Sequence, residues 1–172
     1  MSGVPVVVQY LAEGLLEKGY DVSICTKWYE GLSDKENING IHVYRFRLRK
    51  TLMKRYVGEI DSYRKFVLSL NADVVIFECS ECVTTDVLLR NLSQIKGKKI
   101  FHSHGFSGMR LLPFKWNVNL KYTLGNTYNW FRFKIYYSFT LKKYIKQFDE
   151  TICLSEMDSS KVWLMKNAKK VN

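Results

Sequence analysis

Helical and strand-type hydrophobic patterns alternate along this chain, and that alternation restricts the fold more than any other feature. Residues 4–18 place apolar side chains at positions i, i+3, i+4 and i+7, which predicts an amphipathic helix with Pro5 in its first turn and Gly19 after its end. A short strand is predicted directly afterwards, over residues 21–26. Repeated units of this length predict an α/β fold with a doubly wound, mostly parallel sheet, and 172 residues suffice for one domain with a core.

The same patterns predict the remaining elements. Residues 41–48 alternate like a strand near a sheet edge, after an Asn39-Gly40 turn, whereas the continuous apolar run of residues 73–77 is typical of a strand buried on both faces. The other expected elements are a helix over residues 53–70, a helix capped by Ser80 and ending near Leu92, a strand over 98–104, a helical segment over 117–147, a strand over 150–154, a helix opened by a capping box at 155–158 and ending near Asn167, and the start of a strand at Val171. No apolar stretch reaches the length of a transmembrane helix, and no signal peptide is recognisable.

The charge is distributed unevenly. The chain has 27 Lys and Arg against 16 Asp and Glu, a formal net charge of +11. Residues 1–95 contain 12 basic and 12 acidic side chains, whereas residues 96–172 contain 15 basic and 4 acidic ones. Residues 106–147 combine cations with many aromatic side chains and contain no acid. Such a segment indicates contact with an anionic surface, and composition leaves nucleic acid, phospholipid and phosphorylated ligands as alternatives.

The four cysteines are interpreted as reduced thiols of a cytosolic protein, because no secretory signal precedes them. Cys79 and Cys82 form a C-x-x-C pair, but a zinc ribbon would need a second pair, and a thioredoxin-like motif would have an aromatic residue or proline inside. The sequence therefore predicts neither a metal site nor a redox site.

Candidate functional residues lie where the predicted strands end, because ligands of doubly wound sheets bind at the carboxyl ends of the strands. These ends are Thr26, Glu78, His104 and Ser155. Glu78 and Glu81 could form a carboxylate pair for acid/base chemistry, although across a strand-to-helix junction they need not face each other. Glu81 is explained more simply as an acid in the first turn of a helix, and Ser155 as an N-cap.

The three histidines receive different interpretations. His104 ends a strand beside Gly105 and is expected to face the crevice, with a histidine bonded to a backbone carbonyl as the alternative. His102 is expected to point the opposite way, and His42, in a strand with alternating polar residues, to be solvated.

Four stretches of the chain, residues 3–24, 72–77, 101–105 and 152–156, follow one another in the order of a known family. By these stretches the chain resembles the amino-terminal, acceptor-side domain of a family 4 glycosyltransferase with the GT-B fold. The final residues 169–172 look like the strand that leads into the family's second domain. The family normally begins with a strand before a glycine pair, whereas this chain has Ser2 where the first glycine stands. It also has Glu78 where many members have histidine. By this resemblance the first strand and the donor-binding domain are missing, and the chain alone is expected to be inactive.

The resemblance implies a Rossmann-like sheet that is half of a GT-B architecture. It implies transfer of a hexosyl group from a sugar nucleotide to a saccharide or lipid-linked acceptor, in cell-surface polysaccharide synthesis, with retention of configuration and without metal or other cofactor. His104 takes the catalytic position beside the transferring sugar. Ser2, Gly3, Glu78, Gly105 and Ser155 take positions that bind donor phosphate or acceptor, with Gly3 at a helix start where backbone N–H groups can approach an anion.

The basic aromatic segment, residues 106–147, is interpreted as a largely helical insertion that contacts an anionic membrane or the acceptor. The residues assigned to this surface are Arg110, Lys115, Trp116, Trp130, Arg132 and Lys134. This assignment predicts a cytoplasmic protein at the inner face of the cell membrane; the equal alternative is that the aromatics pack in the core. The rival function is a basic module that binds RNA or another polyanion. No RNP, KH or helix-turn-helix signature supports it, so nucleic acid is not the expected partner.

Overall fold

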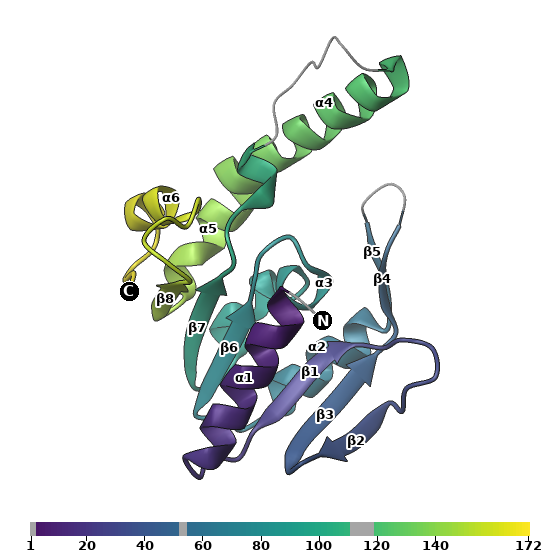
Figure 1. Cartoon of the computed structure of the whole chain (residues 1–172), viewed down its shortest axis with the longest axis vertical. Coiled ribbons are helices and arrows are strands. Elements are labelled where there is room, and N and C mark those ends of the chain that lie inside the picture. Colours follow the sequence, from purple (N-terminus) through teal and green to yellow (C-terminus); the bar gives the residue numbers. More distant parts are fainter. Residues whose placement is uncertain (1–2, 52–54, 111–118) are drawn as a thin grey trace. The chain divides into compact units, whose positions relative to one another are not determined.

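The computed structural model describes residues 3–51, 55–110 and 119–172 (Figure 1). The chain divides into two compact units. The first comprises Met1–Ala72 and Glu81–Lys96, and the second comprises Asp73–Ser80 and Gly97–Asn172. Each unit is described by itself.

The first unit contains two long helices and two small sheets. Its elements are α1 (Val4–Glu17), β1 (Ser23–Lys27), β2 (Lys35–Ile38), β3 (Ile41–Phe46), β4 (Leu48–Lys50), β5 (Tyr56–Gly58), α2 (Ile60–Ser69), α3 (Val83–Asp86) and the 3₁₀ helix η1 (Leu89–Gln94). In the larger sheet the strand order is β1-β3-β2, with β1 parallel and β2 antiparallel to β3. Buried apolar side chains of α1 and β3, together with Val22, form a core cluster in this unit.

Three predictions for this unit need correction. The strand predicted near an edge, β3, is the middle strand of its sheet, because the mostly polar segment Lys35–Ile38 forms the edge strand β2 beside it. The helix predicted over residues 53–70 begins only at Ile60, because Tyr56–Gly58 pairs with Leu48–Lys50 in a two-stranded sheet. Residues 53–54 of that prediction lie outside the described residues.

The third correction concerns the helix predicted to start at Ser80. It is a single α turn, Val83–Asp86, which Cys82 precedes and which no side chain caps, so Ser80 is not its cap. The chain cannot enter a helix at Ser80, because its neighbours Cys79 and Glu81 adopt positive φ angles of 56° and 63°.

The second unit contains an all-parallel sheet of order β6-β7-β8 and a long helical arm. Its elements are β6 (Val74–Glu78), β7 (Lys98–Ser103), the 3₁₀ helix η2 (Ser107–Arg110), α4 (Leu120–Ile135), the π-helix η3 (Tyr136–Leu141), α5 (Lys142–Tyr144), the 3₁₀ helix η4 (Ile145–Gln147), β8 (Glu150–Cys153) and α6 (Lys161–Asn167). Val171 forms an isolated parallel bridge with Thr151, which agrees with the predicted start of a strand there. The fully buried rings of Phe101, Phe106 and Phe148 lie at the centre of this unit.

The helical segment expected over residues 117–147 is confirmed from Leu120 onward, and residues 117–118 lie outside the described residues. The capping box at 155–158 is wrong: α6 begins at Lys161, after Ser160. Residues 155–158 form a turn instead, in which the Asp158 N–H donates to the Ser155 carbonyl at 3.1 Å. The turn is favoured because the Asp158 carboxylate then accepts from the backbone N–H of Ser160 at 2.8 Å.

The mixed α/β class and the parallel sheet agree with the prediction. The strands belong to separate sheets in the described residues, so a single doubly wound sheet stays a prediction. None of the described helices combines the length and the apolar character that crossing a membrane requires.

Candidate functional site

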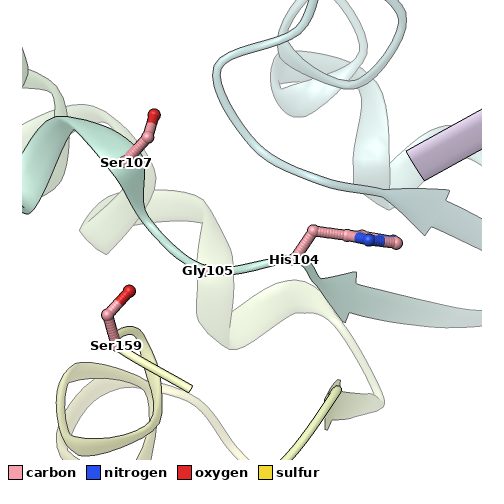
Figure 2. A pocket seen from close by; sticks show the side chains of 4 residues that line it. All are labelled: His104, Gly105, Ser107 and Ser159. Carbon is pink, nitrogen blue, oxygen red and sulfur yellow. The ribbon is translucent and has the colours of Figure 1, made fainter. Parts of the chain in front are cut away.

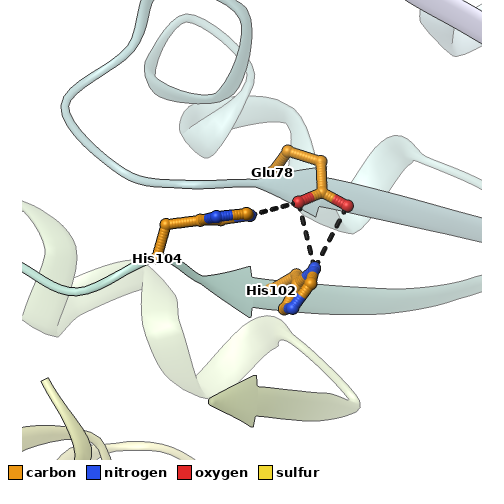
Figure 3. Close-up of side chains that lie close together, drawn as sticks. All are labelled: Glu78, His102 and His104. Atoms are coloured by element: carbon orange, nitrogen blue, oxygen red, sulfur yellow. Dashed lines mark hydrogen bonds and ion pairs between the residues drawn. The ribbon is translucent and has the colours of Figure 1, made fainter. Parts of the chain in front are cut away.

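Glu78, His102 and His104 converge at the carboxyl ends of β6 and β7 in the second unit (Figure 3). His104 Nε2 lies 2.6 Å from Glu78 Oε2, and His102 Nδ1 lies 3.0 Å from the same oxygen and 3.3 Å from Oε1. One carboxylate therefore contacts both imidazoles.

The strand register explains this convergence. Glu78 and His102 are direct partners in the parallel ladder between β6 and β7. Residues two apart in extended chain lie on the same face, so His102 and His104 both reach Glu78. The prediction that His102 points away from His104 is therefore wrong, because it applied the alternation of neighbouring residues to residues two positions apart.

The cluster is largely shielded from solvent. The side chains of Glu78, His102 and His104 are 17%, 11% and 7% exposed. Burial by itself would raise the pKa of Glu78, but the hydrogen bonds from the two imidazoles and their charges outweigh it, and the pKa is lowered overall. Glu78 is therefore a carboxylate at neutral pH. Because a carboxylate only accepts hydrogen bonds, His102 carries a proton on Nδ1 and His104 carries one on Nε2.

Two imidazoles and one carboxylate are also a set of zinc-type ligands. One ligand atom from each of the three side chains lies within 4.8 Å of the others. In the part of the chain that the structure describes, these three residues therefore form a group that could hold a metal ion. The three side chains satisfy one another by hydrogen bonds, so the arrangement needs no ion to be stable.

A surface pocket lies beside the end of β7, lined by His104, Gly105, Ser107 and Ser159 (Figure 2). The His104 imidazole extends away from Ser107 and Ser159, so His104 borders this pocket without pointing its ring at the two serines. Gly105 has a φ of 82°, and a Cβ added there would lie 3.3 Å from Ser159 Oγ. The same Ser159 hydroxyl accepts from the N–H of Phe106 at 3.3 Å. Glycine is thus required at position 105, where the chain leaves β7 and passes close to Ser159.

The adjoining part of the pocket contains a carboxylate that the sequence analysis had assigned to a helix cap. Asp158 lines it together with Ser155, Met157 and Ser159. Asp158 Oδ1 accepts from both the N–H and the hydroxyl of Ser160, at 2.8 and 2.6 Å. Its Oδ2 is buried and has no hydrogen-bond partner among the described residues. A buried acceptor in this state can bind a hydroxyl group of a ligand. The cluster of serines around Asp158 after a strand end was the signal that could have identified it.

The other candidates from the sequence are placed as follows. Ser155 lines the pocket and caps no helix. Gly3 is in the first unit, at the N-cap of α1 with a φ of 81°, and its carbonyl accepts from the N–H of Val6 at 3.1 Å. Ser2 lies outside the described residues. Glu81 belongs to the first unit and Glu78 to the second, so the structure does not describe them as a pair.

The proposed membrane residues differ in their surroundings. Lys134 is exposed, whereas Trp130 is half-buried. The Arg132 guanidinium lies 3.9 Å above the ring centre of Phe133, and its Nε atom is buried. Lys115, Trp116 and the side chain of Arg110 lie outside the described residues.

All four cysteines are free thiols. Burial raises the pKa of the Cys25 thiol from the usual 9.0 to about 12, which makes it unreactive at neutral pH.

Comparison with known proteins identifies one family. The model of Glycosyltransferase Family 4 matches residues 1–163. No curated protein and no solved structure matches the chain.

Proposed function

Because this chain belongs to Glycosyltransferase Family 4, we propose that it is the acceptor side of an enzyme that transfers a hexosyl group from a sugar nucleotide to a saccharide or lipid-linked acceptor. The synthesis of a cell-surface polysaccharide is the proposed setting. A lipid-linked acceptor would place the reaction at the inner face of the cell membrane. Family membership favours this function over the rival polyanion-binding module.

One observation carries the proposal: an ionised Glu78 holds His104 at the edge of a pocket that is also lined by Asp158, whose buried Oδ2 has no hydrogen-bond partner among the described residues. Histidine, carboxylate and hydroxyl groups that border a pocket are side chains of the kind that bind sugar hydroxyls. They lie at the carboxyl ends of parallel strands, where ligands of such sheets bind.

We assign the catalytic position to His104. Its Nε2–H is committed to Glu78, so Nδ1 is the ring atom left to contact a reacting sugar or a donor phosphate. Glu78 acts through His104 and is a positioning residue, since its carboxylate fixes which nitrogen carries the proton. His102 holds Glu78 from the other side at 3.0 Å.

Asp158 is assigned to an acceptor hydroxyl, because Oδ2 can accept its hydrogen bond without breaking those that Oδ1 receives from Ser160. Gly105 and Ser155 form the walls of the same pocket. Gly3, at the start of α1, is assigned to the donor diphosphate, which the N–H groups of a helix start can bind. In the proposed GT-B architecture, the remaining donor contacts come from a second domain.

The test is saturation-transfer NMR on the 172-residue chain with two sets of probes, methyl hexosides and hexoses linked to short prenyl diphosphates. At least one probe should bind, and His104→Ala and Asp158→Asn should each weaken its binding by about tenfold, the effect of losing one hydrogen bond in a polar site. The matched control is His42→Ala, which removes a histidine from the first unit.

Two results would contradict the proposal. One is equal weakening by His42→Ala and His104→Ala. The other is tight binding of RNA with a steep dependence on salt and no binding of any saccharide probe, which would favour the polyanion-binding module.

A further inference from the structure

The long helix of the second unit exposes a continuous apolar face. Large apolar side chains recur along it at intervals of four, four, three, four and four residues: Leu120, Leu124, Tyr128, Phe131, Ile135 and Phe139. We call these six residues the apolar stripe. Each is between 43% and 73% exposed. At 3.6 residues per turn the members of the stripe in α4 occupy an arc of about 80° on the helix, and Phe139 follows in the π-helix η3.

The stripe lies on the side of the helix that faces away from its own packing contacts. Thr123, Phe133 and Tyr137 lie on the inner side. Tyr137 stacks on Phe106 with ring centres 4.7 Å apart, and a Cβ added to Gly108 would come within 2.3 Å of the Phe133 ring. The helix therefore already has a packed face, and the stripe is an additional apolar face. Figure 1 shows α4 as one long helix that continues toward α5.

Cations flank the stripe. Lys121 and Lys134 are exposed and lie on its opposite borders by helical geometry, and Lys142, Lys143 and Lys146 are exposed further along the same arm. Residues 106–147 contain no acidic side chain that could neutralise them. An apolar face bordered by lysines complements a surface that has an apolar interior and anionic groups at its boundary.

We propose that the apolar stripe of α4 and η3 lies in the plane of an anionic phospholipid surface, with its apolar side chains at the level of the acyl chains and Lys121 and Lys134 at the head groups. The positive charge of the flanking lysines complements the anionic head groups, and this favours a phospholipid surface as the partner of the stripe. A nucleic acid would contact the lysines but would leave the aliphatic side chains of Leu120, Leu124 and Ile135 in water, without the gain in free energy that their burial gives. Apart from Lys134, the proposal uses residues other than those assigned to a membrane from the sequence, and it does not depend on the proposed function.

The experiment is co-sedimentation of the 172-residue chain with two kinds of vesicle, pure phosphatidylcholine and phosphatidylcholine with about 30% phosphatidylglycerol. We expect binding to the anionic vesicles and much weaker binding to the neutral ones. Phe131→Gln and Leu124→Gln should each weaken binding by about tenfold or more, because one buried apolar side chain is removed. The control is Tyr122→Gln, since Tyr122 is 56% exposed on the same helix but off the stripe, against 58% for Phe131 and 62% for Leu124. It should change binding by less than about twofold.

The contribution of the flanking lysines to vesicle binding is tested with a separate double variant. Lys121→Gln combined with Lys134→Gln should weaken binding to anionic vesicles by roughly thirtyfold at low ionic strength, and by less in salt. Lys166→Gln with Lys169→Gln removes the same charge from exposed positions elsewhere in the second unit and is the matched control. All substituted side chains are exposed, so the thermal unfolding midpoint should stay unchanged and report intact folding.

Four outcomes would overturn the proposal, the last of them in hydrogen exchange. The first is no sedimentation with anionic vesicles, and the second is equal binding to both vesicle types. The third is a dimer, seen by analytical ultracentrifugation, that Phe131→Gln dissociates while vesicle binding persists, which would assign the stripe to a second copy of the chain. For the unmodified chain, slower hydrogen exchange of the α4 amides on adding anionic vesicles would support it, and unchanged exchange would contradict it.

Discussion

His104 Nε2 lies 2.6 Å from Glu78 Oε2, and the same carboxylate oxygen lies 3.0 Å from His102 Nδ1. A single ionised oxygen thus determines where the protons of two imidazoles lie. The tautomer of His104, and with it the atom left to contact a ligand, is set by a residue of the neighbouring strand.

This relationship predicts different tautomers for the two histidines. At neutral pH, His104 should carry its proton on Nε2 and His102 on Nδ1, because each donates to Glu78 through that atom. Long-range ¹⁵N–¹H correlation spectra of the imidazoles distinguish the two forms. In Glu78→Ala the preference should disappear, whereas Glu59→Ala, which removes a carboxylate from the first unit, should leave it intact. A proton on Nδ1 of His104 in the unmodified chain would contradict the arrangement.

Stability should depend on pH through Glu78. Its folded-state pKa is lowered from the usual 4.5, so its stabilising contribution is fully present well above that value and is lost as the pH falls below it, through the folded-state pKa. Glu78→Gln should lower the free energy of unfolding at neutral pH by about 1 kcal/mol. The difference between the two proteins should shrink below pH 4.5. Urea titrations at several pH values measure it, and a constant difference across the acid range would refute this role of Glu78.

Gly105 should be more sensitive to substitution than an exposed helical glycine. Gly105→Ala should destabilise the chain by about 1–2 kcal/mol, because the residue has a φ of 82° and the added Cβ would lie 3.3 Å from Ser159 Oγ. Gly125→Ala is the matched control. It lies within α4 with nothing within 4 Å of the added Cβ, so it should stabilise by about 0.5–1 kcal/mol. Urea denaturation gives both values, and effects of the same sign would contradict the local geometry.

Cys25 should resist alkylation. With its pKa raised to about 12, its thiolate fraction near pH 8 is roughly a thousandfold below that of an ordinary thiol. Iodoacetamide labelling followed by peptide mapping should therefore find Cys25 modified far more slowly than a cysteine in a short unstructured reference peptide. Equal rates would show that the thiol is not buried.

Much of the secondary structure followed from local patterns. Residues 4–18, 73–77 and 98–104 were predicted correctly, because long amphipathic and continuous apolar patterns leave few alternatives. The errors at β2, β5 and Ser80 have two causes. β2 and β5 are short strands that pair with the neighbouring strands β3 and β4 in local hairpins, and their own patterns are too short to indicate a strand. The helix predicted from Ser80 fails because Cys79 and Glu81 adopt positive φ angles, which their residue types do not predict.

The candidate site was predicted in part. Glu78 and His104 were identified because strand ends of α/β sheets carry ligand-binding residues. Asp158 was missed, because its free carboxylate oxygen is recognisable only once the other oxygen is seen to bind Ser160. The apolar stripe could have been found from its spacing, but only exposure distinguishes it from a face that packs in the core.

The sequence by itself determined the alternation of helices and strands, the family, and a carboxy-terminal half that carries the net positive charge. These depend on local periodicity, motif order and composition, which need no knowledge of long-range contacts. Only the tertiary structure decided that His102 joins His104 on Glu78, that Asp158 faces a pocket, and that the apolar face of α4 is left uncovered. The physical reason is that strand register and side-chain burial arise from contacts between residues far apart in the chain.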